Sequence, residues 1–210
     1  MKLPLYLESS DLSLLEPEFS ELLRKTLKKC EEKGLRARVG CAMRGPGAQA
    51  RMWCQNKSPD NVASMVGILQ KSAPKISALI AAQPCGMSPQ GSWHMPGDSW
   101  HQHGEAADLW VEVKDSARWI GGLAELVAEE VRKVGLYHSH FERHWNPRGR
   151  HWHAQLRKEE TPLSLRGFAD SWSRIEEMMV ERFDFDEFQK VSTTTYNLAF
   201  SRDAFTFVTK

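Results

Sequence analysis

The chain has 210 residues, enough for one domain with a sizeable core or for one domain with an appendage. Its 28 lysines and arginines nearly balance its 27 aspartates and glutamates, so no charge excess points to nucleic acid or to an anionic membrane surface. No segment approaches the run of about 18 apolar residues that a membrane span requires. The N-terminus lacks the apolar core and cleavage site of a Sec signal peptide, so we expect the protein to be made in the cytoplasm without one.

The first half of the chain predicts helices around one strand. Apolar residues recur at helical spacing after Pro17, which predicts a helix over 17–33. Residues 35–41 alternate between apolar and other side chains, the period of a half-buried strand, and this strand would deliver Arg44 to its end. Further helices are expected at 48–55, 61–69 and 75–82, followed by a loop rich in Gly, Pro and Ser over 84–98.

The middle of the chain predicts most of the sheet. Strands are expected at 106–113, 136–141 and 152–156, and an amphipathic helix at 117–134 separates the first two. Helices before and beside a small antiparallel sheet make an α+β domain, which we place at 1–160.

Residues 161–210 form a C-terminal extension in this interpretation. It combines a helix over 165–183, an acidic and aromatic stretch over 183–188, and a hairpin over 191–208. An isolated hairpin is at best marginally stable, and the connection at 159–162 is too short and too poor in Gly and Ser for a long tether. We therefore expect the extension to pack on the first domain.

The four cysteines show no Cys-x-x-Cys spacing. Cys30 lies on the apolar face of a predicted helix and Cys41 on an alternating strand. We expect buried core thiols that stand apart from the histidines.

The histidines are concentrated in one region, because all eight lie between His94 and His153. His101 and Asp108 are separated by a glycine, which indicates a loop that enters a strand. His151 and His153 are two apart on a predicted strand and therefore point to one face. Catalytic zinc sites use three protein ligands, and His101, Asp108 and one histidine of the pair supply that number.

These residues carry a family resemblance. The pattern Ser99-x-His101-x-x-Gly104-x-Ala106-x-Asp108, with a later His-x-His, resembles the zinc D-Ala-D-Ala carboxypeptidases and L-Ala-D-Glu endopeptidases of bacterial cell walls. Their relatives include lysostaphin, the murein endopeptidases and the hedgehog signalling domain. Residues 42–53 resemble the family's Gly-Tyr-Arg-Ser segment, which is followed shortly by Gln-Ala. The resemblance covers roughly residues 14–157.

The resemblance implies a hedgehog-like fold with Zn²⁺ held by His101, Asp108 and His153. It also implies that Arg44 is the positive charge at the oxyanion or at a substrate carboxylate, a task for which a guanidinium is suited. Ser99 and Gln49 would contact the substrate.

The general base is where the chain departs from the family. The carboxypeptidase branch has an acidic residue three positions before the second metal histidine, and here that residue is Arg150. The murein endopeptidase and hedgehog branches have a histidine two positions before it, which corresponds to His151. We assign His151 as the general base, with Glu142 as the reserve candidate.

The expected function is hydrolysis of a bond next to a D-amino acid in peptidoglycan stem peptides or cross-links, as an endopeptidase or a D,D-carboxypeptidase. Without a Sec signal, delivery to the cell wall requires phage lysis or a dedicated secretion machinery. The alternative is a catalytically altered zinc-binding module that recognises cell-wall peptides, which the arginine at position 150 favours.

Overall fold

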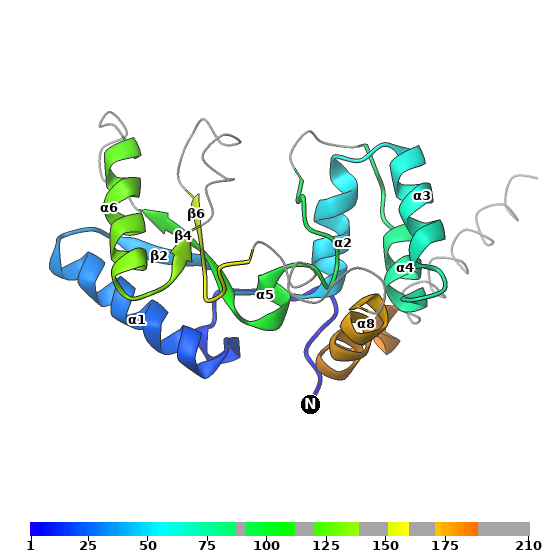
Figure 1. Cartoon of the computed structure of the whole chain (residues 1–210), viewed down its shortest axis with the longest axis horizontal. Coiled ribbons are helices and arrows are strands. Elements are labelled where there is room, and N and C mark those ends of the chain that lie inside the picture. The colour runs from blue at the N-terminus through cyan, green and yellow to red at the C-terminus, as the bar shows by residue number, and fades with distance from the viewer. Residues whose placement is uncertain (87–90, 112–119, 139–150, 160–170, 189–210) are drawn as a thin grey trace, which may run out of the picture.

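The computed structural model describes residues 1–86, 91–111, 120–138, 151–159 and 171–188 (Figure 1). Helices and antiparallel strands are mixed, which confirms the α+β class. The elements are β1 Glu8–Ser9, η1 Leu12–Leu14, α1 Pro17–Glu32, β2 Ala37–Cys41, β3 Met43–Arg44, α2 Pro46–Gln55, α3 Pro59–Leu69, α4 Pro74–Ala81, α5 Trp100–His103, β4 Ala106–Val111, α6 Ile120–Lys133, β5 Tyr137–His138, β6 His151–Gln155 and α8 Ser171–Arg182.

Proline marks the start of four helices. Pro17, Pro46, Pro59 and Pro74 each occupy the first helical position, where the missing N–H costs nothing and the fixed φ already suits the helix. Three of these helices therefore begin one or two residues before the sequence-based prediction. The predicted hairpin at 191–208 and Glu142 lie outside the described residues.

The main sheet has four antiparallel strands in the order β2-β4-β6-β5. One of its faces packs against α1 and α6, and β4 contributes Ala107 and Leu109 to that core. Alternation along β4 then turns Asp108 to the opposite face, away from the two helices. The other members of this core include Phe19, Leu23, Cys30, Val127, Val131 and Ala154.

A β-bulge interrupts the pairing of β2 with β4. Val39 pairs with Leu109, but the next pair is Cys41 with Asp108, so Gly40 is the extra residue. A Cβ at Gly40 would lie 1.6 Å from Nε1 of Trp110, which explains why glycine stands here. The predicted continuous alternation over 35–41 is therefore wrong at its end, because the bulge turns Cys41 to the face that carries Asp108.

A second core joins the N-terminal segment to α2, α3, α4 and α8. Leu5 is fully buried in it, together with Ile76 of α4 and Ile175 of α8. The backbones of Leu3 and Phe183 form a parallel bridge, with hydrogen bonds from Leu3 N to the Arg182 carbonyl and from Asp184 N to the Leu3 carbonyl. Figure 1 shows α8 beside α4 and the N-terminal segment. Residues 171–188 are thus packed into the described fold.

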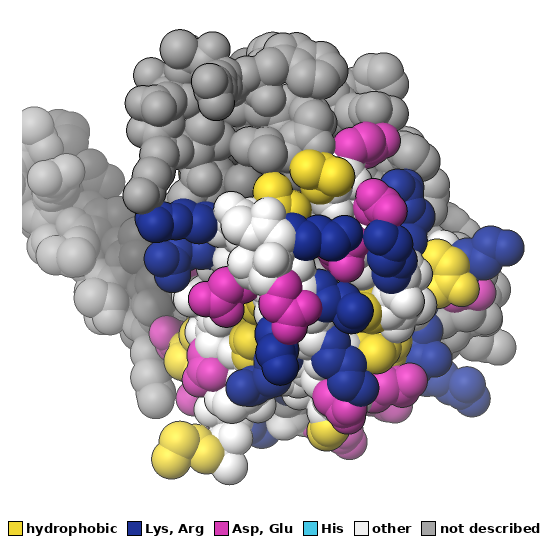
Figure 2. All heavy atoms as spheres, turned by 90° about the vertical axis from the view of Figure 1, so that its left-hand side faces the viewer, with side chains coloured by type: hydrophobic (Ala, Val, Ile, Leu, Met, Phe, Trp, Pro, Cys, Tyr) yellow, Lys and Arg dark blue, Asp and Glu magenta, His cyan; other side chains and the backbone are white. Residues whose placement is uncertain are grey.

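Charges of both signs are interspersed on the face that α1 and α6 present in Figure 2. Lys25 pairs with Glu21 at 2.6 Å, and Lys33 of α1 reaches Glu130 of α6, also at 2.6 Å. The Lys25–Glu21 pair is exposed on both sides and adds little stability, whereas the Glu130 side chain is buried. No helix within the described ranges is both long and apolar enough to cross a bilayer.

Truncation after residue 160 should give an insoluble or strongly destabilised protein. It removes from the second core the buried side chains of Trp172, Ile175, Met179, Phe183 and Phe185, and loss of even one large core side chain costs about 2–5 kcal/mol. Soluble yield and thermal unfolding measure the effect, with a chain ending at residue 188 as the control. A soluble 1–160 protein that unfolds at the temperature of the control would contradict this expectation.

Candidate metal centre

Three elements bring together three side chains of types that can bind a metal, on the face of the sheet away from α1 and α6. Asp108 of β4 and His153 of β6 are direct partners in the antiparallel register. His101 comes from α5, a single helical turn that ends at Gly104 in the left-handed conformation (φ 77°), after which the chain enters β4. The predicted loop at His101 is therefore a short helix, which four residues are too few to signal by periodicity.

The three facing atoms form a nearly equilateral triangle. His101 Nε2 lies 3.0 Å from Asp108 Oδ1 and 3.2 Å from His153 Nδ1, and the latter lies 3.1 Å from the same Asp108 oxygen. A tetrahedral zinc with bonds of about 2.0–2.2 Å holds its ligand atoms roughly 3.3–3.6 Å apart. The triangle is therefore close to the size that one ion of this kind requires.

Hydrogen-bond acceptors lie on the outer side of the triangle, next to the ring nitrogens that point away from it. His101 Nδ1 faces the carbonyl oxygen of Ala42 at 3.4 Å, while its Nε2 faces Asp108 Oδ1 at 3.0 Å, so each nitrogen of this ring has an acceptor. His153 Nε2 lies 3.1 Å from Gln155 Oε1, and the Gln155 amide nitrogen donates to the carbonyls of Arg157 and Glu159. The Gln155 oxygen is thus an acceptor that faces His153 Nε2.

A metal ion in the triangle would take the inward lone pairs of both imidazoles. The single proton of each ring would then lie on its outer nitrogen, which faces an acceptor, Ala42 O for His101 and Gln155 Oε1 for His153. Outer hydrogen bonds commonly orient ligating histidines in this way. The donor set therefore fits a divalent metal ion.

Arg44 of β3 holds the other oxygen of Asp108. Its Nη2 donates to Asp108 Oδ2 at 3.1 Å, and its Nη1 donates to Gln49 Oε1 at 3.3 Å. The Gln49 amide nitrogen donates in turn to Ser92 Oγ and to the His94 carbonyl, both at 2.6 Å. Gln49 is fully buried, so in this structure it fixes the guanidinium and the chain at 92–94. Its contact with substrate stays a prediction.

Burial favours the neutral forms of His94 and His101. Desolvation lowers the pKa of His101 to about 4, against the opposing influence of Asp108. Desolvation, followed by the charges of His153, His101 and Arg44, likewise lowers the pKa of His94 to about 4. Neutral imidazole is the form that binds metals, so the site is ready to bind at neutral pH.

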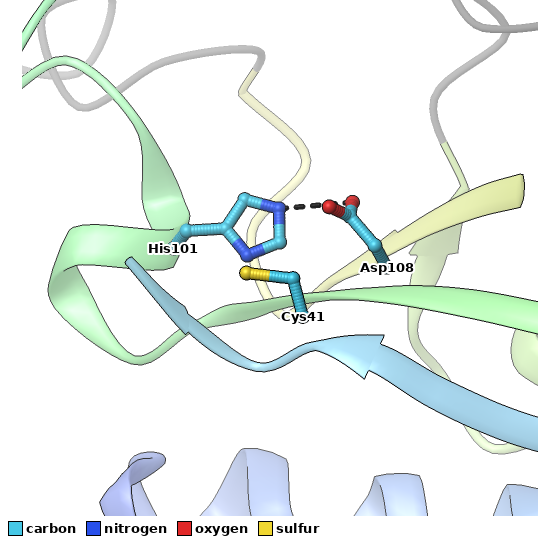
Figure 3. A group of neighbouring side chains, drawn as sticks. All are labelled: Cys41, His101 and Asp108. Carbon is cyan, nitrogen blue, oxygen red and sulfur yellow. Dashed lines mark hydrogen bonds and ion pairs between the residues drawn. The ribbon is translucent and has the colours of Figure 1, made fainter. Parts of the chain in front are cut away.

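Cys41 lies beside the site, so the prediction that the cysteines stand apart from the histidines is wrong for this residue. Its sulfur and one ligand atom each of His101 and Asp108 lie within 4.8 Å of one another, and these three side chains can also hold a metal ion. In Figure 3 the sulfur lies by the His101 nitrogen that is not bonded to Asp108. Desolvation raises the pKa of the Cys41 thiol to about 11, which disfavours the thiolate that metals bind.

The remaining predicted residues are only partly described. His151 pairs with Trp110 in the register of β6, but its side chain, like the whole of Glu142, lies outside the described structure. Ser99 is the buried residue before α5. Sequence reasoning missed Gln155, although it follows His153 by two positions on the same face. It also missed Cys41, whose signal was the glycine at position 40 within a strand pattern.

No protein-family model matches the chain, and no curated protein matches it significantly. The function is therefore argued from the site.

The stability of the metal-free protein should fall as the pH drops from about 6.5 towards 4. In that window an unfolded histidine binds a proton, whereas His94 and His101 in the folded state do not, so acid favours the unfolded chain. Thermal unfolding at pH 7.5 and pH 5 measures the fall. His94→Gln removes one of these groups, and an unchanged acid sensitivity in that variant would contradict the assignment.

Proposed function

We propose that this protein is a zinc-dependent peptidoglycan peptidase whose metal ligands are His101, Asp108 and His153. The observation that carries the proposal is the triangle of potential ligand atoms at 3.0–3.2 Å, in which each residue has a further polar partner on its outer side. The small antiparallel sheet, with helices on one face and the site on the other, supports the hedgehog-like fold of the resembled family.

The choice of this ligand set over the one with Cys41 rests on protonation. Both sets share His101 and Asp108. A neutral imidazole binds a metal without losing a proton, and Gln155 Oε1 faces the outer nitrogen of His153, whereas the Cys41 thiol must lose a proton that burial stabilises. Imidazole and carboxylate ligands with an open fourth position are also the pattern of catalytic zinc.

A zinc ion bound here supplies Lewis acidity for water activation and for polarisation of the scissile carbonyl. Arg44 contributes a permanent positive charge at the same place, held in one orientation by Asp108 and Gln49. Such a preorganised cation favours the negative charge that develops on a carbonyl oxygen during peptide hydrolysis. It also suits a substrate carboxylate, the group expected at the end of a D-Ala-D-Ala peptide.

Proton transfer is assigned to His151, which the β6 register places two residues before His153 in the same strand. Glu142 is the reserve candidate. The substrate class is a peptidoglycan stem peptide or cross-link next to a D-amino acid.

A catalytically altered zinc-binding module is the second candidate. One observation favours it, namely that Arg150 stands where the carboxypeptidase branch has an acidic residue. Zinc content combined with turnover of purified peptidoglycan separates the two candidates.

The purified protein should hold about one zinc per chain, and His101→Ala, Asp108→Ala and His153→Ala should each lose it, because three ligands leave no redundancy. Cys41→Ser should retain zinc. Metal analysis by mass spectrometry after gel filtration gives the stoichiometry. Full occupancy in Asp108→Ala would exclude this ligand set, and loss of zinc only in Cys41→Ser and His101→Ala would favour the cysteine set.

His151→Ala should keep zinc but turn over about 100-fold more slowly or worse, the usual scale for a lost acid-base group. Release of soluble muropeptides is the measurement, and Glu142→Ala is the matched variant. If Glu142→Ala is the inactive, zinc-loaded protein, the base moves to that residue. Wild-type rates in both variants would refute both assignments.

Mass spectrometry of muropeptides after digestion tests the function itself, because it reports activity and the cleaved bond together. Cleavage of a bond next to a D-amino acid, abolished by a chelator and restored by zinc, is the expected result. Intact muropeptides after exposure to a zinc-loaded protein would favour the binding module instead.

A further inference from the structure

The helix that carries His101 is too short to position itself. Within α5 and its cap, the Ser99 carbonyl accepts from Gln102 N, and the Trp100 carbonyl accepts from the N–H groups of Gly104 and Glu105. In a single turn almost every backbone N–H and C=O group is at a helix end, so few hydrogen bonds form within the helix and most groups need outside partners. The location of His101 therefore depends on what contacts the two turns that flank α5.

The turn after α5 is held by α8. Arg182 donates from Nη1 to the His103 carbonyl at 2.8 Å and from Nη2 to the Leu14 carbonyl at 3.0 Å. The neighbouring Gly104 carbonyl accepts from Glu16 N at 2.9 Å. One planar guanidinium thus ties the end of α5 to the end of η1, and a Cβ at Gly104 would lie 2.9 Å from Nη2.

The turn before α5 also contacts α8. Gly97 donates its N–H to Gln102 Oε1 at 2.7 Å, and its carbonyl accepts from His103 Nε2 at 3.0 Å. Gly97 has a φ of 86°, and a Cβ there would lie 2.2 Å from Cγ2 of Ile175 on α8. Side chains of α5 thus bind the turn, and α8 packs against its other side.

The helix α8 is itself firmly placed. Trp172, Ile175 and Met179 are buried in the second core, and the Glu176 carboxylate accepts the backbone N–H of Ile76 at the start of α4. The Arg182 carbonyl accepts from Leu3 N. The guanidinium therefore extends from a rigid support.

We propose that Arg182 is a positioning residue of the metal centre, which holds α5 so that His101 completes the ligand triangle. The inference rests on the proposed function in one respect, because it takes His101 as a zinc ligand. If Arg182 has this role, residues 171–188 contribute to the metal centre as well as to the second core. Loss of outer partners of metal ligands typically lowers metal affinity 10–100-fold, and Arg182 acts one step further out, so we expect about tenfold.

The experiment measures zinc affinity of the full-length chain by competition with a chromophoric chelator, and the visible absorption spectrum of the Co²⁺-loaded protein as a report on ligand geometry. Arg182→Met removes all donors and keeps the length of the side chain. Arg182→Lys keeps the charge but cannot reach both carbonyls in the same planar fork. Arg174→Met, an exposed position on the same helix, is the matched control, and Met179→Ala is a control for simple destabilisation of α8.

Arg182→Met should bind zinc about tenfold more weakly with an altered Co²⁺ spectrum, Arg182→Lys should fall between it and the wild type, and Arg174→Met should match the wild type. Should Arg182→Met fail to fold, the lysine variant carries the test. Wild-type affinity and spectrum in the folded arginine variants would overturn the inference, as would an equal loss in Met179→Ala. A wild-type chain that binds no zinc would instead overturn the proposed function, and the inference with it.

Discussion

The site depends on the pairing of β4 with β6, which sets Asp108 directly opposite His153. In an antiparallel pair, directly opposed side chains on one face are close neighbours, so this register alone brings a carboxylate and an imidazole within bonding reach. Because side chains alternate along a strand, the same register commits Ala107, Leu109 and Ala154 to the core under α1 and α6. A slip of the register by one residue would turn Asp108 and His153 into the core and the apolar side chains out of it, so the register that forms the core also forms the site.

The two carboxylate oxygens of Asp108 have different partners. One oxygen faces the two imidazoles and the other accepts from Arg44, which Gln49 holds in turn. A buried carboxylate needs partners, because desolvation of an unpaired charge is costly. Arg44 supplies one of them permanently, and a cation in the triangle would supply a second. The buried polar network is therefore consistent with metal binding.

Most of the fold was accessible from the sequence, because the helices and strands that build it are long enough to show a period. Motif spacing also selected His101, Asp108 and His153, whose donor atoms the structure places together. The errors have local causes. The helix at His101 is a single turn, and the bulge at Gly40, which turns Cys41 into the site, depends on a strand partner that is remote in the chain. Arg182 donates to the His103 carbonyl, 79 residues away in the chain, and no local sequence pattern predicts such a contact.

The most direct test of the central claim is X-ray absorption at the zinc edge on the zinc-loaded protein, because it identifies the atoms that bind the ion. The account predicts a first shell of nitrogen and oxygen only, at about 2.0–2.2 Å, with the multiple-scattering signature of two imidazoles. A sulfur contribution at about 2.3 Å would place Cys41 in the first shell, and a spectrum with fewer than two imidazoles would remove His101 or His153 from it. Either result would contradict the ligand triangle on which the proposed peptidase rests.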